Sequence, residues 1–253
     1  MSLLLEVKNI SRNFGGLAAL SEVSFDVSPG EIVGVIGPNG AGKTTLFNVI
    51  TGFFPPKQGQ LIFDGEDITK LKPHQISRRG IIRTFQADIL FRELSVQQNV
   101  LAGLHIRSLG LNPKHIFFSP SLIPKSETGI ANDILETVGL TQFRDYMAGD
   151  LPHGHQRMLG IGVALAAEPK LLLLDEPVTG MNLDEIREVI DLIHTLREKG
   201  LTVLIVEHHI KTVMDICHRV IVLSFGKKIA EGSPEEVRRN KDVIEAYLGT
   251  ETD

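Results

Sequence analysis

The sequence predicts an α/β fold with a mainly parallel sheet, an N-terminal antiparallel β section and an inserted helical subdomain. Apolar, strand-like runs alternate with helical patterns along most of its 253 residues, an order that is typical of α/β proteins. The run Leu171–Leu174 is uninterrupted and apolar, as strands buried on both faces of a parallel sheet are. A glycine-rich turn at residues 37–44 joins a β-branched run to a helical pattern.

The first 90 residues are expected to hold short strands around one main helix. Gly52 ends the helical pattern that begins at Lys43. Asp64-Gly65 predicts a turn, and Pro73 suits the first turn of a short helix. The predicted strands are Leu4–Val7, Ser24–Val27, Glu31–Ile36, Leu61–Phe63 and Ile81–Phe85, and the predicted helices are Lys43–Ile50 and residues 73–80.

Residues 95–164 carry helical patterns without a convincing strand and form the predicted subdomain. Prolines at positions 113, 120 and 124 predict an irregular insertion over residues 105–125. The helices expected here are Thr128–Val138, Thr141–Ala148 and Gly154–Glu168.

The α/β pattern then resumes. Asp184–Lys199 has apolar residues at helical spacing, acidic residues in its first turn and Gly200 just after its end. The strands Leu201–Val206 and Arg219–Ser224 follow. We therefore expect one domain over residues 4–248, with its α/β core in 1–94 and 165–230, the helical subdomain in about 95–164 and a helical tail in 231–253.

Composition excludes several classes of protein. Lys and Arg number 26 against 31 Asp and Glu, so no basic field favours a nucleic-acid partner. A single Cys217 rules out an intramolecular disulfide and suits a reducing compartment. No apolar run approaches the roughly 18 residues of a membrane span, and Leu3-Leu4-Leu5 is too short for a signal sequence. We expect a cytosolic chain.

The strongest motif is the segment from Gly37 to Thr44, which fits the phosphate-loop pattern G-x-x-x-x-G-K-[ST]. Its glycines let backbone N–H groups surround phosphate oxygens, Lys43 reaches the β- and γ-phosphates, and Thr44 offers a hydroxyl to Mg²⁺. A chance match is expected in about one per cent of chains of this length. The predicted nucleotide-binding residues are Gly37, Pro38, Asn39, Gly40, Ala41, Gly42, Lys43, Thr44 and Thr45.

The second motif is Asp175-Glu176, directly after the strand Leu171–Leu174. Alone, two carboxylates at a strand end are usually an ordinary solvated terminus. About 130 residues after a phosphate loop, such a pair is the arrangement in which Asp175 binds Mg²⁺ and Glu176 takes a proton from the attacking water.

With these motifs the chain, over residues 4–248, resembles the ATP-binding subunits of ABC transporters. The resemblance implies that Gln86 links Mg²⁺ and water to membrane subunits, that His208 contacts the γ-phosphate, and that Phe14 stacks on adenine. Taken one at a time, each residue also has an ordinary structural explanation. Gln86 could be a surface amide, His208 a solvated loop histidine and Phe14 a residue of the core. Their order and spacing around the two motifs favour the family.

Subfamily patterns make the chain similar to the LivG type, one of two ATPase subunits in branched-chain amino acid importers. The related ATPase of urea importers is a rival for the same residues. The patterns are Arg12-Asn13-Phe14-Gly15-Gly16, Arg83-Thr84-Phe85-Gln86, Leu90-Phe91-Arg92-Glu93-Leu94, the long insertion after His105, and Asp242-Val243-Ile244-Glu245-Ala246-Tyr247-Leu248-Gly249.

Two segments depart from the family pattern. The signature Leu-Ser-Gly-Gly-Gln is replaced by Leu151-Pro152-His153-Gly154-His155, which lacks the serine hydroxyl and one glycine, and Pro152 has no backbone donor. Gly154 is retained as a predicted nucleotide contact at a helix N-terminus. The segment 179–182 reads Thr-Gly-Met-Asn where Ser-Ala-Leu-Asp is usual. These changes favour a heteromeric pair with unequal sites.

The resemblance implies ATP and Mg²⁺ as cofactors and several partners. These are a second, LivF-like ATPase subunit, two membrane permease subunits and, indirectly, a periplasmic or extracellular solute-binding protein. It places the chain at the cytoplasmic face of the membrane through the permease, which region 87–125 is expected to contact. A soluble, non-transport ABC ATPase and an ATP sensor that does not hydrolyse ATP stay open as alternatives; Glu176 and His208 argue against the sensor.

Overall fold

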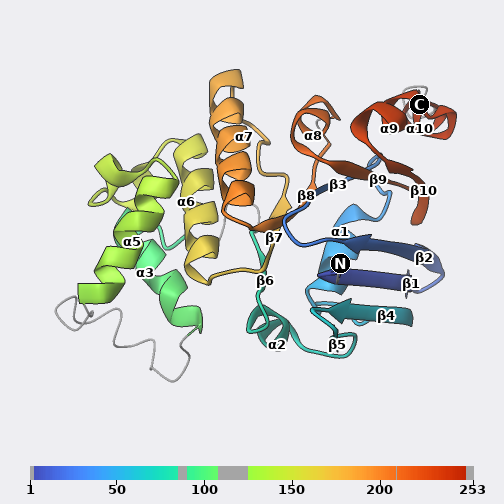
Figure 1. The fold of residues 1–253 in the computed structure, drawn as a ribbon, viewed down its shortest axis with the longest axis horizontal. Helices are drawn as coiled ribbons and strands as arrows, with labels where there is room; N and C mark the ends of the chain where they lie inside the picture. Colours follow the sequence, from blue (N-terminus) through green and yellow to red (C-terminus); the bar gives the residue numbers. More distant parts are fainter. Residues whose placement is uncertain (1–2, 85–89, 108–124, 209, 249–253) are drawn as a thin grey trace. The chain divides into compact units, whose positions relative to one another are not determined.

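The structure is a computed structural model, and it describes residues 3–84, 90–107, 125–208 and 210–248 (Figure 1). It divides into two compact units. The first contains the chain up to Ile81, Lys170–Glu176 and the chain from Ile193; the second contains Ile82–Pro169 and Pro177–Leu192.

The first unit begins with an antiparallel sheet. Its strands are β1 (Leu5–Phe14), β2 (Leu17–Val27), β4 (Gln58–Phe63) and β5 (Glu66–Asp67), in the order β2-β1-β4-β5. The N-terminal antiparallel β section is thereby confirmed, but β1 and β2 are much longer than predicted. Their outer halves pair around a turn at Gly15-Gly16, where polar residues conceal the alternating pattern.

The second sheet of the described residues has six strands. It contains β3 (Ile32–Ile36), β6 (Ile81–Arg83), β7 (Leu171–Asp175), β8 (Thr202–Val206), β9 (Arg219–Ser224) and β10 (Lys227–Gly232), in the order β10-β9-β3-β8-β7-β6. β3 runs parallel to β8 and β9, and β7 runs parallel to β8, whereas β10 is antiparallel to β9. The mainly parallel sheet is confirmed. Phe85, in the predicted extension of β6, lies outside the described residues.

Helix α1 (Lys43–Ile50) has the predicted bounds and packs into the core of the first unit. Leu46, Phe47 and Ile50 are fully buried, in one apolar cluster with residues of both sheets such as Leu5 and Leu173. This packing fixes the position of the turn that precedes the helix.

Among the described residues, five further helices lie partly or wholly in the first unit. They are α2 (Pro73–Ser77), α7 (Leu183–Glu198, which extends into the second unit), α8 (Ile210–Ile216), α9 (Pro234–Arg239) and α10 (Lys241–Leu248). Helix α8 packs closely on β3, because a Cβ atom at Gly34 would lie 2.6 Å from Val213 and 2.9 Å from Cys217. Within the described ranges, no helix combines the length and the apolar character of a membrane span.

The second unit is helical. Helices α3 (Val96–Arg107), α5 (Lys125–Thr137) and α6 (His153–Ala166) pack against one another (Figure 1). Helix α3 continues to Arg107 and so enters the segment 105–125, where the sequence predicted an irregular insertion; residues 87–89 and 108–124 lie outside the described part of the chain.

The predicted helix Thr141–Ala148 is wrong. The chain there forms two short 3₁₀ turns, η2 (Thr141–Phe143) and η3 (Ala148–Asp150). Between them, the carbonyls of Arg144 and Tyr146 accept hydrogen bonds from the backbone N–H groups of Gln97 (3.0 Å) and Val96 (2.9 Å). These are N–H groups of the first turn of α3, which have no partner inside their own helix. In an α-helix over 141–148 the Arg144 carbonyl would instead accept from the N–H of Ala148, which here donates to the carbonyl of Leu94 (3.0 Å).

Candidate functional site

The predicted site residues of the first unit follow three neighbouring parallel strands. Gly37 directly follows β3, Glu176 directly follows β7, and His208 lies two residues after the end of β8; these strands are adjacent in the order β3-β8-β7. The carboxyl ends of parallel strands are where ligands bind in open α/β sheets. The topology thus gathers residues from positions 37, 176 and 208 at one edge.

The glycine-rich turn between β3 and α1 has a backbone that only glycine permits at two points. At Gly37, with φ of +154°, a Cβ atom would lie 2.1 Å from the carbonyl oxygen of Leu223. At Gly42, with φ of +104°, it would lie 2.6 Å from the carbonyl oxygen of Ala19. The turn therefore packs closely against the backbone of β9 and β2, directly before the N-terminus of α1.

Lys43 lies folded back over this turn. Its ammonium donates hydrogen bonds to the carbonyl oxygens of Gly37 (2.6 Å) and Pro38 (3.1 Å), and the residue is only 8% exposed. Burial lowers the pKa of Lys43, while the charges of Glu176 and Asp175 act in the opposite direction. The loop carbonyls thus hold the ammonium within range of the charges of the two carboxylates that the second motif supplies.

Glu176 and His208 form the second part of the site. Glu176 has a left-handed backbone, with φ of +48°, a strained conformation for a side chain of this size; its N–H donates to the carbonyl of Val206 (2.9 Å). The Nδ1 atom of His208 lies 3.6 Å from Oε1 of Glu176 and 3.8 Å from Oε2 of Glu207.

Glu207 was missed in the sequence. It is fully buried, and its carboxylate accepts a hydrogen bond from the backbone N–H of His208 (3.0 Å). The sequence did contain a signal for it: Glu207 directly follows the apolar strand Thr202–Val206, so its carboxylate was expected to be buried. A buried carboxylate needs hydrogen-bond or charged partners, which points to a site.

Phe14 ends β1 and is 41% exposed. Its ring packs edge-to-face on Phe54, with centroids 5.2 Å apart, and the Arg12 guanidinium lies 5.0 Å from its centroid. Arg12 is itself held by a hydrogen bond to the carbonyl of Pro55 (2.8 Å). Phe14 is therefore not a core residue: Phe54 and Arg12 contact its ring, and the rest of the ring is accessible to a ligand.

The residues predicted to bind Mg²⁺ are described except for Gln86, which lies outside the described residues. Thr44 is exposed in the first turn of α1, and Asp175 is 8% exposed at the end of β7. In the described part of the chain, no group of three or more His, Cys, Asp or Glu side chains is arranged to hold a metal. One carboxylate and one hydroxyl suit Mg²⁺, which keeps several waters and substrate phosphates as ligands.

The altered signature lies in the second unit, at the N-terminus of α6. Pro152 occupies the N-cap position, without a side-chain hydrogen bond to the helix. A Cβ atom at Gly154 would lie 2.4 Å from the Glu185 carboxylate, whose other oxygen accepts from the N–H of Asn182 (2.9 Å). His155 packs on the ring of Phe143, with centroids 4.7 Å apart. An acidic side chain, not recognised in the sequence, therefore stands beside this helix terminus.

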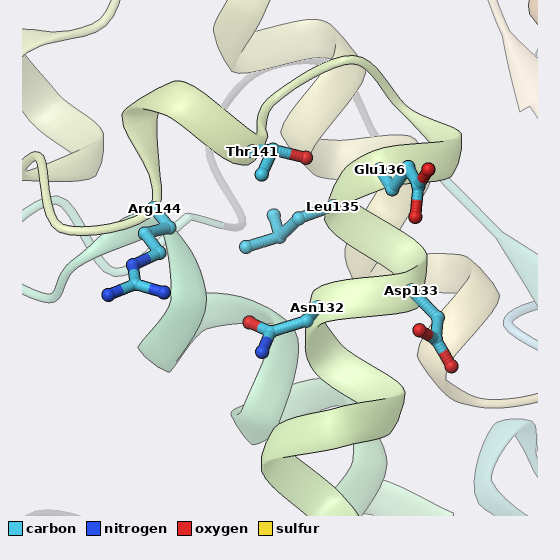
Figure 2. A pocket seen from close by; sticks show the side chains of 6 residues that line it. All are labelled: Asn132, Asp133, Leu135, Glu136, Thr141 and Arg144. Carbon is cyan, nitrogen blue, oxygen red and sulfur yellow. The ribbon is translucent and has the colours of Figure 1, made fainter.

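A pocket of about 360 Å³ opens elsewhere in the second unit. Figure 2 shows it between α5 and the following turn, with Asp133 and Glu136 on one side and Arg144 on the other. None of the predicted site residues lines it.

Comparisons with known proteins extend over nearly the whole chain. A family model described as ABC transporter matches residues 20–179, and one described as branched-chain amino acid ATP-binding cassette transporter matches residues 227–253. The high-affinity branched-chain amino acid transport ATP-binding protein BraF of Pseudomonas aeruginosa is 42% identical over 250 residues, which cover 97% of this chain and 98% of BraF.

LivG of Escherichia coli, a protein of the same description, is 40% identical over 249 residues, with 97% and 98% of the two chains covered. A crystal structure of the ADP conformation of an ATP-binding cassette of an ABC transporter matches with a TM-score of 0.87 at 34% identity. That match covers 98% of this chain and 100% of the other.

Proposed function

This chain belongs to the ABC transporter family of ATPases, and on that basis we propose that it hydrolyses ATP to power the uptake of branched-chain amino acids through a membrane permease. The observation that carries the substrate class is the similarity over the full length to two ATP-binding proteins of branched-chain amino acid transport. The match of residues 227–253 to a model of the same description supports it independently.

In this proposal the phosphate loop binds the triphosphate. Backbone N–H groups of residues 39–44 surround phosphate oxygens, and the Lys43 ammonium exchanges the Gly37 and Pro38 carbonyls for β- and γ-phosphate oxygens. Thr45 adds a hydroxyl in the first turn of α1. The exchange is favourable because a buried ammonium gains an anion in place of neutral carbonyls.

Glu176 and His208 act on the γ-phosphate side. Glu176 accepts the proton of the attacking water, and its strained backbone, held by the hydrogen bond to Val206, fixes where the carboxylate lies. His208, 3.6 Å from that carboxylate, orients it and contacts the γ-phosphate. Glu207 sets the position of His208 through the backbone N–H.

In this proposal the remaining predicted residues bind Mg²⁺ and adenine. Thr44, Asp175 and Gln86 would hold Mg²⁺, which neutralises phosphate charge when it is bound. Phe14 stacks on adenine, with Arg12 and Phe54 holding its ring in place.

The proposal includes the partners of the chain. A second, LivF-like ATPase subunit places its signature on the ATP of Lys43, while Gly154 faces the partner's ATP. Two permease subunits hold the pair at the cytoplasmic face of the membrane, in contact with region 87–125, and a solute-binding protein delivers substrate to them. No nucleic acid takes part.

Reconstitution of the chain with its cognate subunits in proteoliposomes tests this function. ATP hydrolysis should rise when leucine-loaded binding protein is supplied, and labelled leucine should accumulate. Stimulation by urea and not by leucine would identify the alternative importer class. Copurification with ribosomes or DNA, and with no membrane protein, would favour the soluble class.

A further inference from the structure

One buried amide holds the turn that precedes helix α3. Asn99 is 1% exposed, and its side-chain oxygen accepts a hydrogen bond from the backbone N–H of Phe91 (2.9 Å). Its amide nitrogen donates to the carbonyls of Phe91 (3.0 Å), Ser95 (2.9 Å) and Leu94 (3.3 Å). A buried amide has to find such partners. Because all of them belong to one turn, Asn99 fixes the backbone of residues 91–95.

The same turn is joined to the segment 146–149. Ser95 and Met147 lie directly opposite each other in an antiparallel bridge. Backbone hydrogen bonds beside the bridge run from the N–H groups of Val96, Ala148 and Gly149 to the carbonyls of Tyr146 (2.9 Å), Leu94 (3.0 Å) and Arg92 (3.1 Å), respectively. Asn99 therefore orders a turn whose other side is bonded to a segment about 50 residues further along the chain.

The segment 146–149 leads directly to the N-terminus of α6. Only Asp150 and Leu151 separate Gly149 from Pro152, the N-cap residue. The side-chain amide of Gln156 donates to the carbonyl of Leu151 (2.8 Å), which ties this short link back to the helix. A continuous path of hydrogen bonds and short chain links thus runs from Asn99 to the α6 terminus, within the second unit.

The two joined segments also carry exposed apolar side chains. Phe91 is 48%, Tyr146 56% and Met147 50% exposed. Apolar side chains that gather on a surface mark a site of interaction. Phe91 belongs to region 87–125, which in the proposed function contacts the permease. The other two side chains lie on the segment that leads to α6.

We propose that Asn99 is a positioning residue that makes the turn 91–95 and the segment 146–149 one rigid piece, through which contact of the permease with Phe91 sets the position of the α6 N-terminus. The inference rests on the proposed function, because it needs the permease and a partner ATP that faces this terminus. It assigns to a buried residue the coupling between the permease and the altered signature.

The physical reason is that a loose turn would absorb a displacement. Coupling between distant groups needs elements that move together. With Asn99 and the backbone bonds in place, a shift at Phe91 is passed to Gly149 and from there to Pro152. The phosphate loop and Lys43 belong to the first unit, so the affinity of this chain for Mg-ADP should not depend on Asn99.

The first test is Asn99→Asp in the reconstituted transporter. The carboxylate keeps an acceptor for Phe91 but loses the N–H donors. The stimulation of ATP hydrolysis by leucine-loaded binding protein should fall about two- to tenfold, the range for one neutral hydrogen bond, with Mg-ADP affinity unchanged. Asn132→Asp is the matched control, because Asn132 only accepts from the Gln97 side chain (2.7 Å) in its recorded hydrogen bond. Full stimulation in Asn99→Asp would overturn the proposal.

The second test replaces the lost hydrogen bonds by a disulfide. Opposed residues with ladder hydrogen bonds on either side have Cα atoms about 4.5 Å apart, within the range of about 4.4–6.8 Å for a disulfide. Ser95→Cys with Met147→Cys can therefore form one, and the native Cys217 is buried in the first unit. In the Asn99→Asp chain, oxidation should restore stimulation and reduction should remove it again. A closed disulfide without restored stimulation would overturn the proposal.

The same disulfide in a chain that keeps Asn99 tests the proposal even if Asn99→Asp fails to fold. Stimulation and leucine uptake should persist with the disulfide closed, because the two segments move together; Ser95→Cys alone controls for the altered side chain. If closing the disulfide blocked uptake, the segments would have to separate during transport, and the proposal would be wrong.

The unaltered chain separates this inference from the proposed function. If leucine-loaded binding protein does not stimulate the unaltered transporter, the proposed function fails and the inference fails with it. If the unaltered transporter and Asn99→Asp are stimulated equally, only the role of Asn99 is refuted.

Discussion

The Nδ1 atom of His208 lies 3.6 Å from Oε1 of Glu176, although 32 positions separate the residues (208 − 176). The contact arises because β7 and β8 are adjacent and parallel, with Asp175 paired to Val206. Each strand therefore delivers its next residues to the same edge of the sheet.

Replacing Glu176 by Gln should separate binding from hydrolysis. The amide keeps the size of the side chain but cannot take a proton from water, so ATP should still bind while turnover falls by two orders of magnitude or more, on the order of a general-base contribution. Turnover of the reconstituted transporter and ATP binding are the measurements.

Glu188→Gln is the matched control, because Glu188 is an exposed residue of α7. An undiminished rate in Glu176→Gln would mean that another group is the base.

Replacing Lys43 by Ala should weaken nucleotide binding directly. The ammonium supplies a charged hydrogen bond to phosphate, and losing one costs about 1.5–3 kcal/mol, or about 10- to 150-fold in affinity. Titration calorimetry with Mg-ADP measures it. Lys228→Ala serves as control, since Lys228 lies on the edge strand β10 and pairs with Glu231. Equal affinities for the Lys43 variant and the control would refute the assignment of the loop.

Phe14 offers a fluorescence test of adenine stacking. The chain has no tryptophan, so Phe14→Trp introduces a single reporter, and its emission should change with Mg-ADP but not with Mg-pyrophosphate. Phe14→Ala should lower ADP affinity by about 1–3 kcal/mol, the value of one base–aromatic stack.

Phe225→Trp is the control, at a turn residue that is 88% exposed. If pyrophosphate alone reproduced the full emission change of Phe14→Trp, adenine would not be the group that the ring contacts.

The sequence predicted those parts of the fold that local chemistry determines. Helix α1 and the strand β7 follow from a glycine boundary and from an uninterrupted apolar run, and the α/β class is confirmed. The Thr141–Ala148 prediction failed because the Arg144 carbonyl and the Ala148 N–H, which a helix would join, bond to Gln97 and Leu94 instead. Strand β10 was missed because half of its residues are charged, as is frequent in edge strands.

The residues of the candidate site also differ in whether the sequence alone reveals them. Lys43 and Glu176 are recognisable because each sits in a motif of fixed spacing. Glu185 is not, because its contact with Gly154 depends on how segments distant in the sequence pack.

Acid stability should depend on Glu31 and Arg219, which are joined by hydrogen bonds of 2.8 and 2.9 Å. Burial alone would raise the pKa of Glu31, but hydrogen bonds from Arg219 and the N–H of Ser28 and the charge of Arg219 lower it overall. A lowered carboxyl pKa stabilises the fold above its unfolded value of 4.5, and this contribution is lost as the pH falls through the folded pKa.

Glu31→Gln should therefore lower the free energy of unfolding at pH 7 by about 1.5–3 kcal/mol and flatten its decline in acid. Urea unfolding from pH 3 to 7 measures both effects. Asp145→Asn, at an ion pair in which Asp145 is 78% exposed, should change little. If the free energy of unfolding fell in acid as steeply in Glu31→Gln as in the unaltered chain, the acid dependence would arise from other carboxylates.

The two ATP sites of the proposed heterodimer should be unequal. In a head-to-tail pair, the ATP on Lys43 meets the partner's signature, while the N-terminus of α6 meets the partner's ATP. At that terminus Pro152 supplies no donor, and Glu185 stands against Gly154. A carboxylate beside the helix N-terminus offsets part of the positive charge of that terminus. Its negative charge also repels a phosphate.

Disabling one phosphate-loop lysine at a time tests this asymmetry. The site on Lys43 keeps its own Glu176 and His208, so Lys43→Ala should remove most ATPase activity if the partner's signature is regular. The same change in the partner should remove less, because that site has lost a hydrogen bond worth about 10- to 150-fold. Glu185→Gln should raise the activity that remains in Lys43→Ala. The opposite ranking of the two lysines would show that the α6 terminus serves the partner's ATP fully despite Pro152 and Glu185.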